Sequence, residues 1–247
     1  MAGHSKWANT KHRKERADAK KGKIFSRIAK EIATAVKLGG ADSKGNPRLR
    51  LALQQAKEVN MPLENCERLI KKASGGDQAD YFELVYELYG HGGVGILVEI
   101  MTDNKNRTSS DMRIATNKRG GSIATPGAVS FNFDRRGVIL FKKGTEQSSP
   151  LDEDALFLAA TDAGALDVET GDEECVVLTE PTDLCRIREA LQEAGFVAES
   201  ADLVRMPKNM VECDEETLQA NHALIEWLEN IDDVDEVYHN MAEPESV

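Results

Sequence analysis

The hydrophobic pattern of this chain changes at the Gly75-Gly76 pair, and this change limits the folds it can adopt. Before the pair, apolar residues recur at helical spacing in residues 23–38, 46–60 and 62–74, each segment bounded by Gly, Asn or Pro. After it, short β-type runs alternate with helical segments. A chain of 247 residues is also too long to fold around one small hydrophobic core. We therefore predict an α+β protein that begins with a small three-helix domain.

Residues 137–206 form a complete pattern of their own. The predicted order is strand 138–141, helix 152–163, strand 167–170, strand 176–179, helix 181–194 and strand 197–205. This βαββαβ order is that of a ferredoxin-like split unit. We expect a domain of this kind at residues 135–206.

The remaining segments predict a second α+β domain that is closed by the C-terminus. Strands at 81–88 and 94–102 flank a glycine-rich turn, Thr108 with Asp111 can cap a helix, and a strand-like stretch lies at 129–133. The final helix 214–230 and strand 234–239 cannot bury their apolar faces alone. The expected divisions are a basic arm (1–21), a helical domain (22–76), an α+β domain (77–134 plus 207–240), the inserted α+β domain (135–206) and a tail (241–247).

Charge is distributed unevenly along the sequence, although the whole chain carries −12. Residues 1–76 hold 18 Lys and Arg against 7 Asp and Glu, a net charge of +11, so the remaining 13 basic and 36 acidic residues carry −23. Such asymmetry is typical of a basic nucleic-acid-binding element joined to acidic domains. A solvated charged face that binds nothing is the alternative.

The basic arm is the strongest candidate binding element. Its basic side chains can each neutralise a phosphate and release a counterion. Trp7 can stack on an unpaired base or anchor the arm to the helical domain, and His12 can contact phosphate or remain solvated. The candidate residues of the arm are Lys6, Trp7, Lys11, His12, Arg13, Lys14, Arg16, Lys20 and Lys21.

Further candidate cations lie within the predicted domains: Lys23, Arg27, Arg48, Arg50 and Arg107. Arg107 belongs to a polar loop between a strand and a helix, which either caps that helix or exposes N–H groups to an anion. The turn Gly90–Gly93 precedes a strand rather than a helix, so it fits a hairpin turn better than a phosphate-binding loop.

No pattern of catalysis or metal binding is present in the sequence. The four cysteines are scattered without zinc spacing, and no nucleophile elbow, H-E-x-x-H motif or Walker loop occurs. We therefore expect no enzyme activity, cofactor or metal, although an unrecognised catalytic cleft stays an alternative. The lack of a long apolar segment or a signal-peptide core predicts a cytoplasmic protein with no membrane partner.

Several motifs together resemble one family. They are MAGHSKWANTKHRK, KGKIFSRIAKEI, NPRLR, NMP, TDNKNRT and the GGS stretch before F-x-F, and they resemble the YebC/PmpR family of probable transcriptional regulatory proteins. This group includes the mitochondrial translational activator of cytochrome c oxidase. The resemblance extends to about residue 239 and implies three domains and non-enzymatic action. His91 stands where the family usually has Pro, which puts a strict role for that turn in doubt.

Two binding functions follow from these observations. The first is a DNA-binding transcriptional regulator that uses the arm and the helical domain. The second is a translation factor that binds ribosomal RNA, with the acidic domains facing basic ribosomal proteins. The absence of a familiar DNA-reading module and the presence of Trp7 favour RNA, whereas the family's usual description favours DNA. We expect a monomer.

Overall fold

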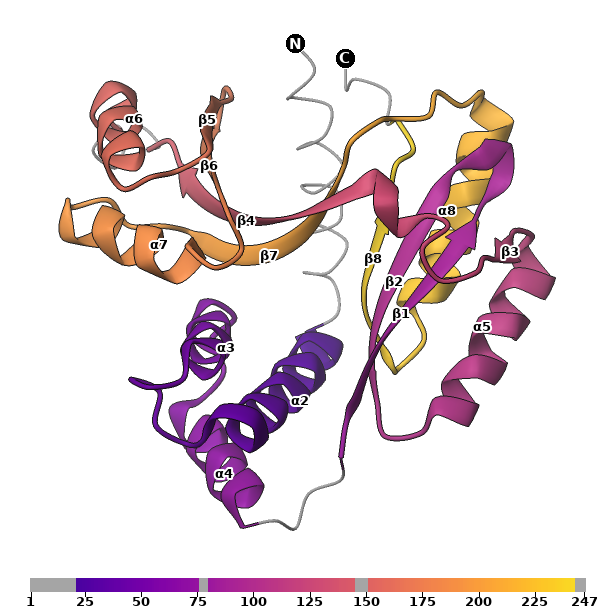
Figure 1. The fold of residues 1–247 in the computed structure, drawn as a ribbon, viewed down its shortest axis with the longest axis horizontal. Helices are drawn as coiled ribbons and strands as arrows, with labels where there is room; N and C mark the ends of the chain where they lie inside the picture. The colour runs from indigo at the N-terminus through magenta and orange to yellow at the C-terminus, as the bar shows by residue number, and fades with distance from the viewer. Residues whose placement is uncertain (1–20, 76–79, 145–150, 243–247) are drawn as a thin grey trace.

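The computed structural model describes residues 21–75, 80–144 and 151–242 (Figure 1). It contains a helical part followed by two antiparallel sheets, each covered by helices. This confirms the predicted α+β fold. A helical domain comes first, two α+β domains follow, and the third domain is inserted in the second.

The helical domain packs α2 (Lys21–Gly39) against α3 (Pro47–Glu58) and α4 (Leu63–Ser74). Its core includes Ile28, Ile32 and Leu49, which are fully buried. Asn46 holds the α2–α3 connection because its side chain caps α3 at Leu49 N (3.1 Å) and donates to the carbonyls of Ala35 (2.7 Å) and Gly40 (2.8 Å). One side chain therefore fixes the end of one helix and the start of the next.

The first sheet has the order β3-β1-β2-β8. Its strands are β1 (Phe82–Tyr89), β2 (Gly95–Thr102), β3 (Ser122–Ile123) and β8 (Val234–His239). Helices α5 (Lys105–Arg119) and α8 (Glu215–Glu229) cover one face, and the core between them and the sheet is aliphatic. The C-terminal strand β8 therefore pairs with β2, far from it in sequence.

The second sheet has the order β5-β6-β4-β7. Its strands are β4 (Phe133–Lys142), β5 (Asp167–Thr170), β6 (Glu174–Thr179) and β7 (Ser200–Pro207), and its helices are α6 (Glu153–Asp162) and α7 (Leu184–Glu193). The chain order is βαββαβ, as the sequence pattern predicts. Along the chain, the whole unit is inserted between β3 and α8, which belong to the domain of the first sheet.

The two sheets share an apolar interface, in which Leu97 and Tyr238 of the first sheet pack with Val138, Leu140 and other residues of the second. The helical domain joins them differently. Among the described residues, the apolar clusters link it to its neighbours only through Leu51, which packs on the inserted domain's core, and Tyr81, which packs on the helical core. Most of its other specific contacts are polar.

Two local predictions are wrong. The cap of α5 is Asn104, not Thr108, because the Asn104 side chain accepts from the N–H groups of Asn106 and Arg107 (both 3.1 Å). Residues 130–132 form a short 3-10 turn, and the strand begins only at Phe133. The second difference is caused by a contact of this segment with Glu87 on β1.

The carboxylate of Glu87 organises the segment before β4. It accepts hydrogen bonds from the backbone N–H groups of Gly127 (2.6 Å), Val129 (2.6 Å) and Ser130 (2.8 Å). These groups are then unavailable to a strand ladder. Burial alone would raise the pKa of Glu87, but the three donors outweigh it and lower that pKa.

No helix in the described part of the chain has the length and apolar character needed to cross a membrane.

Candidate nucleic-acid interface

The candidate residues of the basic arm fall outside the described part of the chain. These are Lys6, Trp7, Lys11, His12, Arg13, Lys14, Arg16 and Lys20. Lys21 is the first residue of α2. The structure therefore addresses the candidates from Lys23 onward.

Lys23 and the neighbouring Lys30 project from α2 onto the domain of the first sheet. The Lys23 ammonium donates to the carbonyls of Glu229 and Ile231 (2.7 Å to the latter), at the C-terminal end of α8. Lys30 donates to the carbonyls of Met101 (2.9 Å) and Asp232 (3.1 Å). A cation at a helix C-terminus satisfies exposed carbonyls and complements the helix dipole.

Arg27 and Arg48 make ion pairs with the first sheet. Arg27 pairs with Glu236 on β8. Arg48 binds Glu31 of its own domain through two nitrogens (2.6 and 2.9 Å) and also pairs with Glu83 on β1. The Arg48 guanidinium thus bridges the helical domain and the sheet with charge-assisted hydrogen bonds.

Arg50 pairs with Glu189 on α7 (3.2 Å), which joins the helical domain to the inserted domain. Its Nε is buried without a hydrogen-bond partner, as are Nε and Nη1 of Arg188 beside Glu189. Arg188 lies 4.0 Å from Glu189 through its Nη2. The contact of Arg50 with α7 therefore leaves one of its donors, Nε, buried and unsatisfied.

Arg107 is held in the first sheet's domain by two carboxylates. It contacts Asp103 (2.8 Å) and the buried Asp233 (2.7 and 3.1 Å), which also accepts from Thr108 (2.9 Å). Burial would raise the pKa of Asp233, but hydrogen bonds from Arg107 and Thr108 lower it. Because Asn104 already occupies two N–H groups at the start of α5, the geometry here is that of a structural cap.

The glycine-rich turn connects β1 to β2 as a hairpin. The backbone N–H of His91 donates to Asn221 on α8 (2.8 Å), and its ring contacts the carbonyl of Arg119 at the end of α5 (2.8 Å). His91 thereby ties both helices to the turn. We find no phosphate-binding geometry in this loop, since a strand follows it.

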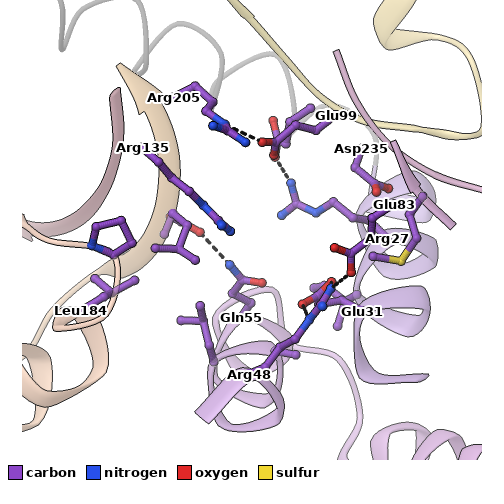
Figure 2. A pocket seen from close by; sticks show the side chains of 18 of the residues that line it. Arg27, Glu31, Arg48, Gln55, Glu83, Glu99, Arg135, Leu184, Arg205 and Asp235 are labelled. Atoms are coloured by element: carbon purple, nitrogen blue, oxygen red, sulfur yellow. Dashed lines mark hydrogen bonds and ion pairs between the residues drawn. The ribbon is translucent and has the colours of Figure 1, made fainter. Parts of the chain in front are cut away.

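A cleft of about 890 Å³ lies where the three domains meet (Figure 2). Polar contacts between domains surround it: Arg48 with Glu83, Arg27 with Glu236, Arg205 with Glu99 (2.8 Å), and Gln55 with Asp202 (2.9 Å). These contacts fix the relative positions of its walls.

Two charged groups in this cleft lack such partners. Arg135 on β4 forms no hydrogen bond or ion pair with another described residue, and Figure 2 shows its side chain directed into the cleft. Asp235 on β8 lies on another wall. Burial raises its pKa to about 7, although the nearby cations of α2 act to lower it.

Other cations of the helical domain face solvent. Lys57 on α3 and Arg68, Lys71 and Lys72 on α4 are exposed and form no ion pair with another described residue. Figure 1 places α4 at the edge of the molecule, away from the second sheet. Lys71 and Lys72 lie in the last turn of α4, where they also complement the helix dipole.

No cluster of side chains suited to a metal ion occurs among the described residues. All four cysteines are free, and burial raises the pKa of the Cys66 and Cys175 thiols, which makes them poor nucleophiles. The described part thus defines a three-domain α+β protein with polarised charge, whose basic helical domain is docked on acidic neighbours.

Comparison with known proteins identifies the family. The family model for the TACO1/YebC N-terminal domain matches residues 5–76, and that for the TACO1/YebC second and third domain matches residues 81–241. The chain belongs to the TACO1/YebC family, as its motifs indicated.

Curated relatives align over essentially the whole chain. A probable transcriptional regulatory protein of Protochlamydia amoebophila is 62% identical over 247 residues, covering 100% of this chain and 99% of the relative. One from Chlamydia trachomatis is 58% identical over 243 residues, covering 98% and 100%. The crystal structure of a conserved hypothetical protein from Aquifex aeolicus has a TM-score of 0.81 at 40% identity and covers 93% of each chain.

Proposed function

We propose that this protein is a non-enzymatic regulator of gene expression that binds nucleic acid, with the DNA of transcribed genes as its target. The basic arm makes the first contacts with phosphate, and the exposed cations of the helical domain extend them. The observation that carries this proposal is the charge distribution: +11 in residues 1–76 against −23 in the rest. A phosphate surface attracts the first and repels the second, so binding is polarised toward one end.

Three further observations support it. The relatives from Protochlamydia amoebophila and Chlamydia trachomatis bear the name probable transcriptional regulatory protein. The described residues contain no cluster suited to a metal ion, and sequence motifs of the common enzyme classes do not occur. Exposed Lys57, Arg68, Lys71 and Lys72 lie in the same domain as the end of the arm.

A second function, binding to ribosomal RNA as a translation factor, has its own supporting observation. The acidic domains present many carboxylates that fit basic ribosomal proteins, and duplex DNA offers no counterpart for them. The helical domain, formed by α2, α3 and α4, also does not match a familiar DNA-reading module. Cross-linking in cells, followed by sequencing of both DNA and RNA, separates the two. Enrichment at discrete promoters supports the first, and a defined patch of ribosomal RNA supports the second.

The role of the arm is tested with a variant in which Lys11, Arg13, Lys14 and Arg16 become Ala. Each lost phosphate contact makes the dependence of log affinity on log salt concentration shallower by about 0.9 for duplex DNA and about 0.7 for a single strand. We expect weaker binding and a slope shallower by up to about 3 to 4 units. An unchanged affinity and slope would rule out the arm as the binding element.

A further inference from the structure

Five cations of the helical domain point inward rather than to solvent. We call them the docked basic face: Lys23, Arg27, Lys30, Arg48 and Arg50. The partners described above for these cations in the other domains are oxygens of backbone carbonyls and carboxylates. A phosphate backbone offers acceptors of the same kind, spaced along a strand. The neighbouring domains therefore satisfy this face much as nucleic acid would.

The surface that covers this face is built from polar contacts. The two sheet domains share a buried apolar core, whereas the helical domain reaches them through side chains such as Arg27, Lys30 and Arg48, with Leu51 as its apolar contribution to the inserted domain's core. Exposed or partly exposed ion pairs are individually weak and are screened by salt. Of the three domains, the helical one is thus the easiest to separate.

The docked arrangement also carries an unfavourable contribution. At the contact of α3 with α7, where Arg50 pairs with Glu189, Nε of Arg50 is buried without a hydrogen-bond partner. A buried, unsatisfied donor opposes the state that contains it, because water no longer solvates it. Separation of α3 from α7 returns this group to solvent or to another acceptor.

We propose that the docked basic face is a second, concealed surface for a nucleic-acid phosphate backbone, exposed when the helical domain separates from the two sheet domains. Carboxylates of the sheet domains compete with phosphate for the same cations. This inference rests on the proposed function and adds to it a two-stage contact: the arm binds first, and the docked face follows at high local phosphate density.

The first experiment removes the competing carboxylates. The variant Glu83→Gln/Glu189→Gln/Glu236→Gln takes away the carboxylates of the sheet domains that pair with Arg48, Arg50 and Arg27, while Arg48 keeps Glu31 of its own domain. Losing three weak ion pairs raises the ratio of open to closed protein by roughly 3- to 100-fold. We expect affinity for a short duplex DNA or a ribosomal RNA hairpin to rise by about tenfold within that range.

A matched control has the same change in net charge. Glu153, Glu180 and Glu199 pair with Lys143, Arg136 and Lys142, all within the inserted domain. Their replacement by Gln also removes a carboxylate partner from each of three cations but breaks none of the described contacts with the helical domain. We expect a clearly smaller gain in affinity. Equal gains in both variants would mean that general electrostatics explains the effect, and the inference would be wrong.

The second experiment holds the domains together. In a protein whose partly exposed Cys185 and Cys213 are replaced by Ser, Gln55→Cys and Asp202→Cys replace a hydrogen-bonded pair between α3 and β7. A short, reducible bismaleimide joins the two thiols. We expect the cross-linked protein to bind more weakly than the same protein before linking, with a shallower salt dependence, and to recover after reduction. Unchanged binding on cross-linking would refute the inference.

These outcomes separate the inference from the proposed function. If the wild-type protein binds neither DNA nor RNA, or if the arm variant binds as well as wild type, the proposed function fails. If the wild type binds through its arm but the cross-link and the three Glu→Gln changes have no specific effect, only the concealed surface is excluded.

Discussion

Replacing Asp235 by Asn is expected to stabilise the protein at neutral and alkaline pH. Asp235 lies in the cleft on β8, and burial is the largest influence on its carboxyl, with Glu31 adding to it. The cations Lys30, Arg27 and Lys23 oppose the shift but do not cancel it, so the pKa is raised to about 7. The folded protein therefore binds a proton more tightly here than the unfolded chain does.

The sign and size follow from proton linkage. A carboxyl whose pKa is raised on folding contributes stability below its unfolded pKa, and this contribution is lost as pH rises through the folded pKa. A change from 3.8 to about 7 corresponds to about 4 kcal/mol at most. Asn has the same shape and no charge to desolvate. We expect Asp235→Asn to be about 2–4 kcal/mol more stable than wild type at about pH 8, an advantage that shrinks as pH falls below about 7 and is nearly lost at about pH 4.

Urea unfolding of both proteins across this pH range measures the effect, because the difference between them isolates the contribution of one residue. Asp232→Asn is the matched control, because Asp232 is exposed. Its backbone carbonyl accepts a hydrogen bond from Lys30, and the substitution keeps that carbonyl. That variant should follow the wild-type curve. If Asp235→Asn is instead less stable than wild type at about pH 8, Asp235 is ionised and stabilised by the cations of α2, and the reasoning is refuted.

Three other substitutions test the structural roles assigned above. Glu87→Gln should lower the free energy of unfolding by about 2–4 kcal/mol, because an amide can accept only part of the three backbone hydrogen bonds; a loss within error in thermal unfolding would contradict this role. Asn46→Ala should cost about 1–3 kcal/mol through the lost cap and two further hydrogen bonds, measured by urea unfolding. Arg107→Ala should reduce stability by leaving Asp233 unpaired but leave nucleic-acid affinity unchanged, and a large loss of affinity in the stably folded variant would restore Arg107 as a ligand.

The elements of the fold were predictable where local signals agreed. Asn46-Pro47 marks the start of α3, and the strand predicted at 234–239 is found at these residues. The prediction failed at residues 129–133 because a side chain in β1, Glu87, draws the backbone of that segment into a turn. Alternating Val129, Phe131 and Phe133 mimic a strand, yet Phe131 is 70% exposed. A contact between residues about 40 positions apart decided the local conformation.

The residue types of the candidate site were predictable from the sequence, but which cations form ion pairs and which are exposed was not. Basic residues on α2 and α3 were identified from charge alone. Their partners lie much later in the chain, as with Arg27 and Glu236, separated by 209 positions. No local pattern links such residues, because only the tertiary fold brings β8 beside α2. Lys71 and Lys72 are exposed and form no ion pair within the described part, which is a property of the fold that charge alone does not indicate.

The nesting of one domain inside another has a consequence for the order of events on the ribosome. Of the surfaces that hold α2, β8 and the end of α8 are made much later than the helical domain. Until they emerge, the edge of β2 has no partner strand, and α2 lacks the acceptors of Lys23 and Arg27, although Met101 and Glu83, which bind Lys30 and Arg48, are already present. Each newly made molecule therefore begins with part of its basic face uncovered, and the arrival of α8 and β8 covers it.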